Sequence, residues 1–108
     1  MEQLRIQEKR GANYSLLELA GALDFYSFTE LRQRAFALIR EENLVLDLSA
    51  LTSMDSSGLS VILGSSTLGE EAGRRLYLMR PSAGARRALE STGFMDMLNI
   101  IYSVTEVV

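Results

Sequence analysis

The chain has 108 residues, of which 47% are hydrophobic and 23% charged, a composition typical of one globular domain with its own core. Its net charge of −3 argues against a general nucleic-acid binder, which would normally carry a basic surface. Because the chain contains neither cysteine nor histidine, it cannot form a disulfide framework, a thiolate site or a Ser-His-Asp triad. The commonest zinc ligands are missing for the same reason.

The first residues, Met1–Arg5, lack the apolar core of a signal peptide. No apolar run approaches the roughly 20 residues that a membrane span requires. We therefore expect a cytoplasmic protein without a membrane span, forming a single domain over residues 1–108.

The first part of the chain predicts a hairpin followed by a helix. Leu4–Gln7 and Tyr14–Leu19 alternate apolar and polar residues, and they are predicted to pair as antiparallel strands across a turn at Lys9–Asn13. Apolar residues then recur every three or four positions over Phe28–Glu42, which predicts an amphipathic helix.

The middle of the chain predicts a buried strand and a second helix. Leu44–Leu48 is almost continuously apolar, as in a central strand that is covered on both faces. The segment Ser49–Ser53 is predicted to be a polar connection to a helix that starts at Ser56 or Ser57 and ends before Gly73.

The last third predicts a further strand, a short helix and a terminal strand. Arg75–Met79 is the fourth strand, and Pro81 and Ser82 stand where a third helix would begin. Gly93 ends that helix, and Ile100–Val104 is a fifth strand or an extended tail. Strands that alternate with helices after an initial hairpin predict an α/β domain with a mixed sheet of four to five strands.

The segment Met54–Gly58 places an acid and two hydroxyls where a buried strand delivers the chain to the start of a helix. Free N–H groups and the positive end of the helix dipole favour an anion at such a place. A phosphoryl group on Ser56 would be tolerated there, meeting N–H groups such as those of Gly58 and Leu59. The alternative is that one serine only caps the helix. With Ser57 present as well, one hydroxyl can cap while the other stays available.

Three aspartates accompany these serines. Asp55 either caps the helix or orients the neighbouring hydroxyl and accepts its proton during phosphoryl transfer. Asp47 interrupts an apolar strand, so it must be hydrogen-bonded, and we expect it at the strand's C-terminal end, bonded to the connection that leads to Asp55. Asp24 follows an adjacent strand, which predicts that Asp24, Asp55 and Ser56 cluster at one edge of the sheet.

Clustered carboxylates could attract Mg²⁺. The sequence lacks a phosphate-binding glycine loop and a lysine near these residues, so we expect neither a metal nor a cofactor.

Small residues at Gly58, Ser60 and Gly64 leave one side of the second helix thin. Either another molecule approaches closely there, or the helix packs tightly on the sheet.

The motifs themselves resemble a known family. Leu44–Ser49 followed by Met54–Leu59 closely resembles the STAS domain family, and in particular the bacterial anti-sigma factor antagonists. Gly21–Asp24 is similar to the family's Gly-Glu-Leu/Ile-Asp motif, and Ser91–Phe94 to its late Thr/Ser-Gly-Leu/Phe element. The resemblance covers essentially the whole chain. It implies a single STAS-type domain with its helices packed mainly on one face of the sheet.

The resemblance also implies a phosphorylation-controlled binding protein that is not an enzyme. Ser56, directly after the motif aspartate, would be the phosphoacceptor. The unphosphorylated form would bind an anti-sigma factor of the histidine-kinase-like ATPase fold and release a sigma factor. That ATPase would phosphorylate Ser56 and end the binding, and a PP2C-type phosphatase would reverse the modification. The partner-binding residues would be Asp24, Asp55, Ser57, Gly58 and Ser60.

Two positions depart from the family pattern, and one alternative role remains. Ala22 stands where the family often has glutamate, and Ser60 where glycine is common, so contacts with the partner would differ there. The alternative is a non-enzymatic STAS scaffold, or an accessory subunit of an ABC-type lipid transporter. The same surface would then dock a partner without phosphorylation of Ser56.

Overall fold

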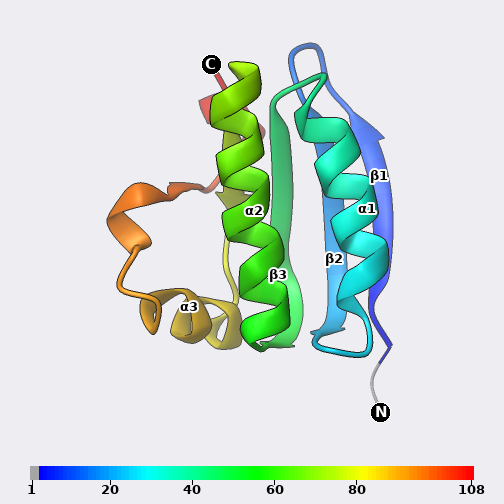
Figure 1. Cartoon of the computed structure of the whole chain (residues 1–108), viewed down its shortest axis with the longest axis vertical. Coiled ribbons are helices and arrows are strands. Elements are labelled where there is room, and N and C mark those ends of the chain that lie inside the picture. Colours follow the sequence, from blue (N-terminus) through cyan, green and yellow to red (C-terminus); the bar gives the residue numbers. More distant parts are fainter. Residues whose placement is uncertain (1–2) are drawn as a thin grey trace.

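The computed structural model describes residues 3–108 as a five-stranded sheet with helices against it (Figure 1). The strands are β1 (Arg5–Arg10), β2 (Ser15–Leu23), β3 (Leu44–Met54), β4 (Leu76–Met79) and β5 (Asn99–Ile101). The helices are α1 (Phe28–Ile39), α2 (Ser56–Ala72) and α3 (Ala83–Glu90), with two short 3-10 helices, η1 (Met95–Met97) and η2 (Val104–Glu106).

The strands lie in the sheet in chain order, β1-β2-β3-β4-β5. Only the first pair, β1 with β2, is antiparallel, and the other neighbours are parallel. Parallel neighbours require a crossover connection, which α1, α2 and α3 provide in turn. Helices α1 and α2 lie side by side over β2 and β3 (Figure 1). The predicted mixed sheet and single-domain α/β architecture are confirmed.

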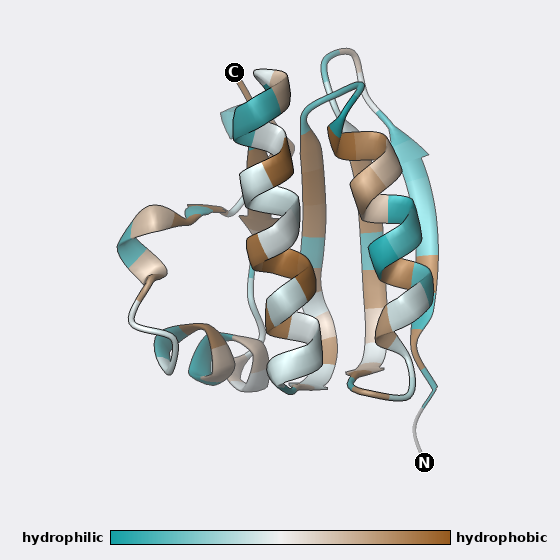
Figure 2. Cartoon of the chain, viewed as in Figure 1, coloured by the Kyte–Doolittle hydropathy of each residue, from teal (hydrophilic) through white to brown (hydrophobic). Residues whose placement is uncertain are grey.

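Both faces of the central strand β3 are buried, as its apolar sequence predicts. Leu44, Leu46 and Leu48 belong to the main core, between the sheet and the helices. Val45 faces the other way, into a smaller cluster that Val107 of the C-terminal segment helps to cover. Figure 2 shows the hydrophobic colouring along β2 and β3, where they pass behind the helices.

The prediction was wrong about the segment after Leu48. Ser49–Ser53 is not a loop, because β3 continues through Met54 and its partner β2 continues to Leu23. Strand β4 pairs only with the first four residues of β3, Leu44–Asp47. The second half of β3 therefore has a strand neighbour on one side only, and polar residues are tolerated there.

The ends of the helices agree with the prediction or differ from it by a few residues. Helix α1 ends at Ile39 and not at Glu42, because the N–H groups of Glu41 and Glu42 both bond to the Leu38 carbonyl and close the last turn. Gly73 ends α2 with a φ of 72°, the left-handed conformation that glycine adopts readily. The predicted cap of the third helix is confirmed, since the Ser82 hydroxyl accepts from Ala85 N.

One buried hydroxyl in α2 is expected to cost stability. Ser65 is fully buried, and within residues 3–108 its hydroxyl has no hydrogen-bond partner. Because an unpaired hydroxyl loses its hydration without compensation, Ser65→Ala should raise the free energy of unfolding by about 1 kcal/mol. Chemical denaturation followed by circular dichroism measures this. A loss of stability on substitution would show that the hydroxyl is satisfied in solution.

Candidate functional site at the carboxyl edge of β2 and β3

Two loops meet where β2 and β3 end. The last residues of these parallel strands, Leu23 and Met54, are paired in register. The next residue of each chain segment is an aspartate, Asp24 after β2 and Asp55 after β3. The Asp55 N–H donates to the Leu23 carbonyl at 3.1 Å. The predicted clustering of Asp24, Asp55 and Ser56 at one sheet edge thus follows from the parallel pairing.

Asp55 is the N-cap of α2. One carboxylate oxygen, Oδ1, accepts from the backbone N–H of Ser57 at 2.8 Å and of Gly58 at 3.3 Å. The other oxygen, Oδ2, accepts from Phe25 N in the β2–α1 loop at 3.1 Å. Of the two roles left open for Asp55, the structure shows the cap. With both oxygens bound to backbone donors, Asp55 fixes the helix start against the neighbouring loop.

Ser56 is the first residue of α2, and its side chain is exposed. Because Asp55 caps the helix, neither serine is needed for capping. In the part of the chain that the structure describes, the Ser56 hydroxyl has no hydrogen-bond partner. The oxygen therefore stands at the helix tip, open to an approaching molecule.

The predicted contacts of a phosphoryl group on Ser56 need correction. The N–H of Gly58 is bound to the Asp55 side chain, and the N–H of Leu59 to the Asp55 carbonyl at 3.0 Å. These donors are not free to receive a phosphate. A phosphoryl group on Ser56 would lie in solvent beside the Asp55 carboxylate, with the helix dipole as its main support.

Asp24 is half-buried and shapes the β2–α1 loop. Its carboxylate accepts from Tyr26 N at 2.9 Å and from the Ser27 hydroxyl at 3.2 Å. Ser27 also donates to the carbonyl of Ala22 at 2.8 Å. Ala22 itself is buried, 7% exposed, so this departure from the family pattern lies under the surface and leaves the loop above it intact.

The small residues of α2 serve packing. A Cβ at Gly58 would lie 2.7 Å from Leu23 Cγ and 2.8 Å from Met54 Cγ, so the glycine lets α2 approach the ends of β2 and β3. At Gly64 it would lie 2.8 Å from the tip of the Phe36 ring of α1. Of the two alternatives for the thin side of α2, tight packing accounts for both glycines.

The two remaining predicted site residues lie beside Ser56 on the first turns of α2. Ser57 is half-buried, whereas Ser60 is exposed and its hydroxyl donates to the Ser57 carbonyl at 2.6 Å. Among the described residues, no group of three or more acidic, histidine or cysteine side chains is arranged to hold a metal ion.

Asp47 does not lie at the C-terminal end of its strand as predicted, because β3 continues to Met54, but its predicted hydrogen bonding to the segment after Leu48 is confirmed. It sits in the first half of β3, paired with Glu18 and Met79. Its carboxylate accepts from the N–H and hydroxyl of Ser49 at 3.0 and 2.7 Å, and from Arg80 at 3.1 Å. These bonds satisfy a side chain that is only 5% exposed, so Asp47 is structural.

The environment of Asp47 predicts a pH dependence. Burial raises the pKa of its carboxyl, but the hydrogen bonds from Ser49 and the nearby Arg80 outweigh this and hold the pKa below its usual range. The resulting stabilisation is present above the unfolded pKa of about 3.9 and is lost as the pH falls through the folded pKa. The stability advantage of the wild type over Asp47→Asn should therefore shrink below about pH 4. Urea titrations at several pH values measure it, and a constant difference would contradict the assignment.

Sequence reasoning missed two neighbours of the site. Phe25 and Tyr26, in the β2–α1 loop, are 67% and 76% exposed. A signal was present, because two consecutive aromatic residues stand between a predicted strand and the apolar stripe of a predicted helix. Neither belongs to that stripe, so the core does not require them.

Known proteins are similar to this chain in sequence. The STAS domain model matches residues 3–107. The chain is 29% identical to the anti-sigma-B factor antagonist of Bacillus subtilis (strain 168) over 98 residues, 90% of each protein. It is 30% identical over 101 residues to the anti-sigma F factor antagonist of Paenibacillus polymyxa, covering 91% of this chain and 85% of the relative.

Solved structures show the same fold. The anti-sigma factor antagonist SpoIIAA in its unphosphorylated form has a TM-score of 0.79 at 22% identity, covering 94% of this chain and 91% of SpoIIAA. The phosphorylated form of the Bacillus protein SpoIIAA has a TM-score of 0.74 at 22% identity, covering 94% of this chain and 95% of that one. Anti-sigma factor antagonists are non-enzymatic regulators. None of the helices within residues 3–108 has the length and hydropathy needed to cross a membrane. The chain belongs to the STAS domain family and is a homologue of the bacterial anti-sigma factor antagonists.

Proposed function

We propose that this protein is an anti-sigma factor antagonist whose binding is controlled by phosphorylation of Ser56. In its unphosphorylated form it binds an anti-sigma factor of the histidine-kinase-like ATPase fold and releases a sigma factor. The same ATPase phosphorylates Ser56, and a PP2C-type phosphatase restores the binding form. We place this cycle in the cytoplasm, where sigma factors act.

The observation that carries the proposal is the state of the Ser56 hydroxyl. It is exposed at the first residue of α2, and no hydrogen bond holds it within residues 3–108. The cap is supplied by Asp55, so modification of Ser56 removes no bond that the helix needs. That a structural relative, SpoIIAA, is known in unphosphorylated and phosphorylated forms supports the same reading.

Charge explains how phosphorylation would end binding. A phosphoryl group adds up to about two negative charges at pH 7. It would lie next to the carboxylate of Asp55, on a protein whose net charge is already −3. A partner that covers Ser56 must desolvate this charge, and a kinase also brings nucleotide phosphates to the same place. The interface is lost without any refolding of the antagonist.

Site mapping with a matched pair of variants tests the acceptor. The ATPase anti-sigma factors of the same genome are incubated with ATP and with wild type, Ser56→Ala or Ser57→Ala, and phosphate is located by peptide mass spectrometry. Wild type and Ser57→Ala should reach about one phosphate per chain, while Ser56→Ala should remain at background. Equal incorporation into Ser56→Ala would refute the assignment. Binding to a transporter ATPase without phosphorylation would favour the accessory-subunit role.

A further inference from the structure

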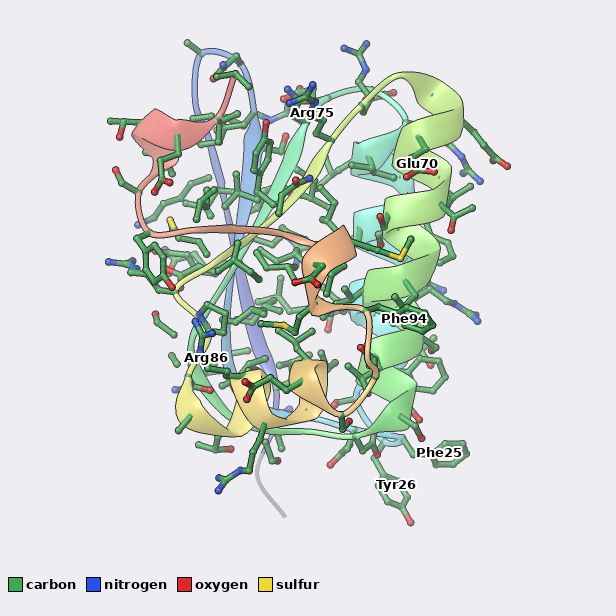
Figure 3. The ribbon with its side chains drawn as sticks, turned by 90° about the vertical axis from the view of Figure 1, so that its left-hand side faces the viewer. Phe25, Tyr26, Glu70, Arg75, Arg86 and Phe94 are labelled. Carbon is green, nitrogen blue, oxygen red and sulfur yellow. The ribbon has the colours of Figure 1, made fainter. Side chains whose placement is uncertain are left out.

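Two aromatic side chains project from the molecule next to the phosphoacceptor. Phe25 and Tyr26 are 67% and 76% exposed, and Figure 3 shows both pointing away from the body of the protein near the start of α2. Isolated apolar side chains are normal on a surface, whereas contiguous exposed apolar patches mark interaction sites. Tyrosine and other aromatics dominate the energetics of many interfaces.

The aromatic pair is held in place before any partner arrives. The Phe25 N–H donates to Asp55 Oδ2 at 3.1 Å, and the Tyr26 N–H to Asp24 Oδ1 at 2.9 Å. The Phe25 ring lies edge-on to that of Tyr26, with centroids 5.7 Å apart, and 6.2 Å from that of Phe28. Because the loop is already ordered, little conformational entropy remains to be lost on binding.

The same hydrogen bond fixes the distance between the pair and Ser56. Asp55 directly precedes Ser56 and holds Phe25 through its side chain. A kinase that brings its nucleotide to the Ser56 hydroxyl must cover the surface around it, and the aromatic loop is part of that surface. The docking surface is thus continuous with the phosphoacceptor.

The acidic residues beside Tyr26 indicate what kind of surface the partner presents. A hollow of about 450 Å³ beside Tyr26 is lined in part by the acidic residues Asp24 and Glu30. Glu30 already forms an ion pair with Arg34 at 3.5 Å, whereas within residues 3–108 no lysine or arginine pairs with Asp24. A pocket that receives the aromatic rings would therefore be apolar, with a basic residue on the rim that faces Asp24.

We propose that Phe25 and Tyr26 are the anchor residues by which the anti-sigma factor kinase binds this protein. The two rings fill an apolar pocket on the kinase whose basic rim meets Asp24, while Ser56 faces the bound nucleotide. The inference rests on the proposed function, because it assigns the docking surface of that same kinase. Phosphorylation at Ser56 and anchoring by the aromatic pair are separate properties, so each can fail alone.

Matched alanine variants test the anchors. Phe25→Ala and Tyr26→Ala are compared with Phe94→Ala and Tyr102→Ala, which remove the same side chains at other exposed positions, 47% and 61% exposed. Each anchor variant should bind the kinase about thirtyfold more weakly or worse by calorimetry, and the controls within about threefold of wild type. The KM for phosphorylation should rise by a similar factor with kcat nearly unchanged, because the anchors lie away from the reacting hydroxyl.

The outcomes are distinguishable. If both anchor variants bind like wild type while Ser56 is still phosphorylated, the anchor assignment is wrong and the proposed function stands. If wild type neither binds nor accepts phosphate from any ATPase anti-sigma factor of its genome, the proposed function fails and the anchors fail with it. If sedimentation shows that the pair mediates self-association instead, with kinase binding unaffected, the partner is a second copy and the inference is overturned. Circular dichroism of each variant confirms that it is folded.

Discussion

Ser56→Asp is expected to weaken binding to the anti-sigma factor about a hundredfold, which corresponds to about 2.7 kcal/mol. The substitution places a permanent carboxylate beside Asp55, on the exposed tip of α2. An interface that covers this tip must desolvate two adjacent like charges that have no counter-ion within residues 3–108. The fold should not suffer, since an acid in the first turn of a helix is stabilising by about 0.3–1 kcal/mol.

Thr67→Asp is the matched control for this effect. It adds the same charge to the same helix, at an exposed position about 16 Å further along its axis. If the position of the added charge determines the loss of binding, the affinity of Thr67→Asp for the anti-sigma factor should stay within about threefold of wild type. The reason is that exposed charges beyond a Debye length are largely screened. Isothermal titration of the two variants against the same anti-sigma factor gives the comparison. Equal weakening of binding by both substitutions would mean that net charge controls the affinity and that the position of Ser56 does not.

Gly58→Val is expected to lower the free energy of unfolding by about 2–3 kcal/mol. A Cβ at this position would lie 2.7 Å from Leu23 Cγ, in the core, and 2.8 Å from Met54 Cγ. Neither atom is the free end of a side chain, so the start of α2 must move away from the sheet. Because Asp55 holds the helix start, the hydrogen bond from Phe25 N should weaken as well.

Gly64→Val provides the comparison within the same helix. Its Cβ would meet the tip of the half-buried Phe36 ring, which can turn aside, so a loss of about 1 kcal/mol is expected. Thermal and urea denaturation measure the free energy of unfolding of both variants. If Gly58→Val were as stable as wild type and impaired only in phosphorylation, the glycine would serve the approach of a partner, which is the other alternative that the sequence left open.

The sequence predicted the local structure of the candidate site well where local rules decide. Asp55-Ser56-Ser57-Gly58 at the start of an apolar helix pattern is a local signal, and the helix begins at Ser56 as expected. The parallel pairing of β2 and β3 follows from the intervening helix, and it brings Asp24 next to Asp55. Asp24 is predicted at the site for this reason, and Asp55 because it directly precedes Ser56.

The predictions that were wrong concern residues whose structure depends on contacts between distant segments of the chain. Ser49–Ser53 is polar and resembles a loop, yet it is strand because β2 extends alongside it to Leu23. Asp47 is predicted at the C-terminal end of its strand, but β3 continues to Met54, and no local pattern reveals the hydrogen bond from Arg80 at the end of β4. The identity of the helix cap was also undecided, since Asp55, Ser56 and Ser57 are all good caps and only the geometry selects among them.

The central claim is that the Ser56 hydroxyl is a reversible charge switch for docking, and one titration series tests it most directly. The same preparation is titrated against the anti-sigma factor before phosphorylation, after stoichiometric phosphorylation, and again after treatment with a PP2C-type phosphatase. The account predicts that affinity falls several hundredfold, about 3–4 kcal/mol, on phosphorylation and returns fully on dephosphorylation. Equal affinity of the phosphorylated and unphosphorylated forms would contradict it.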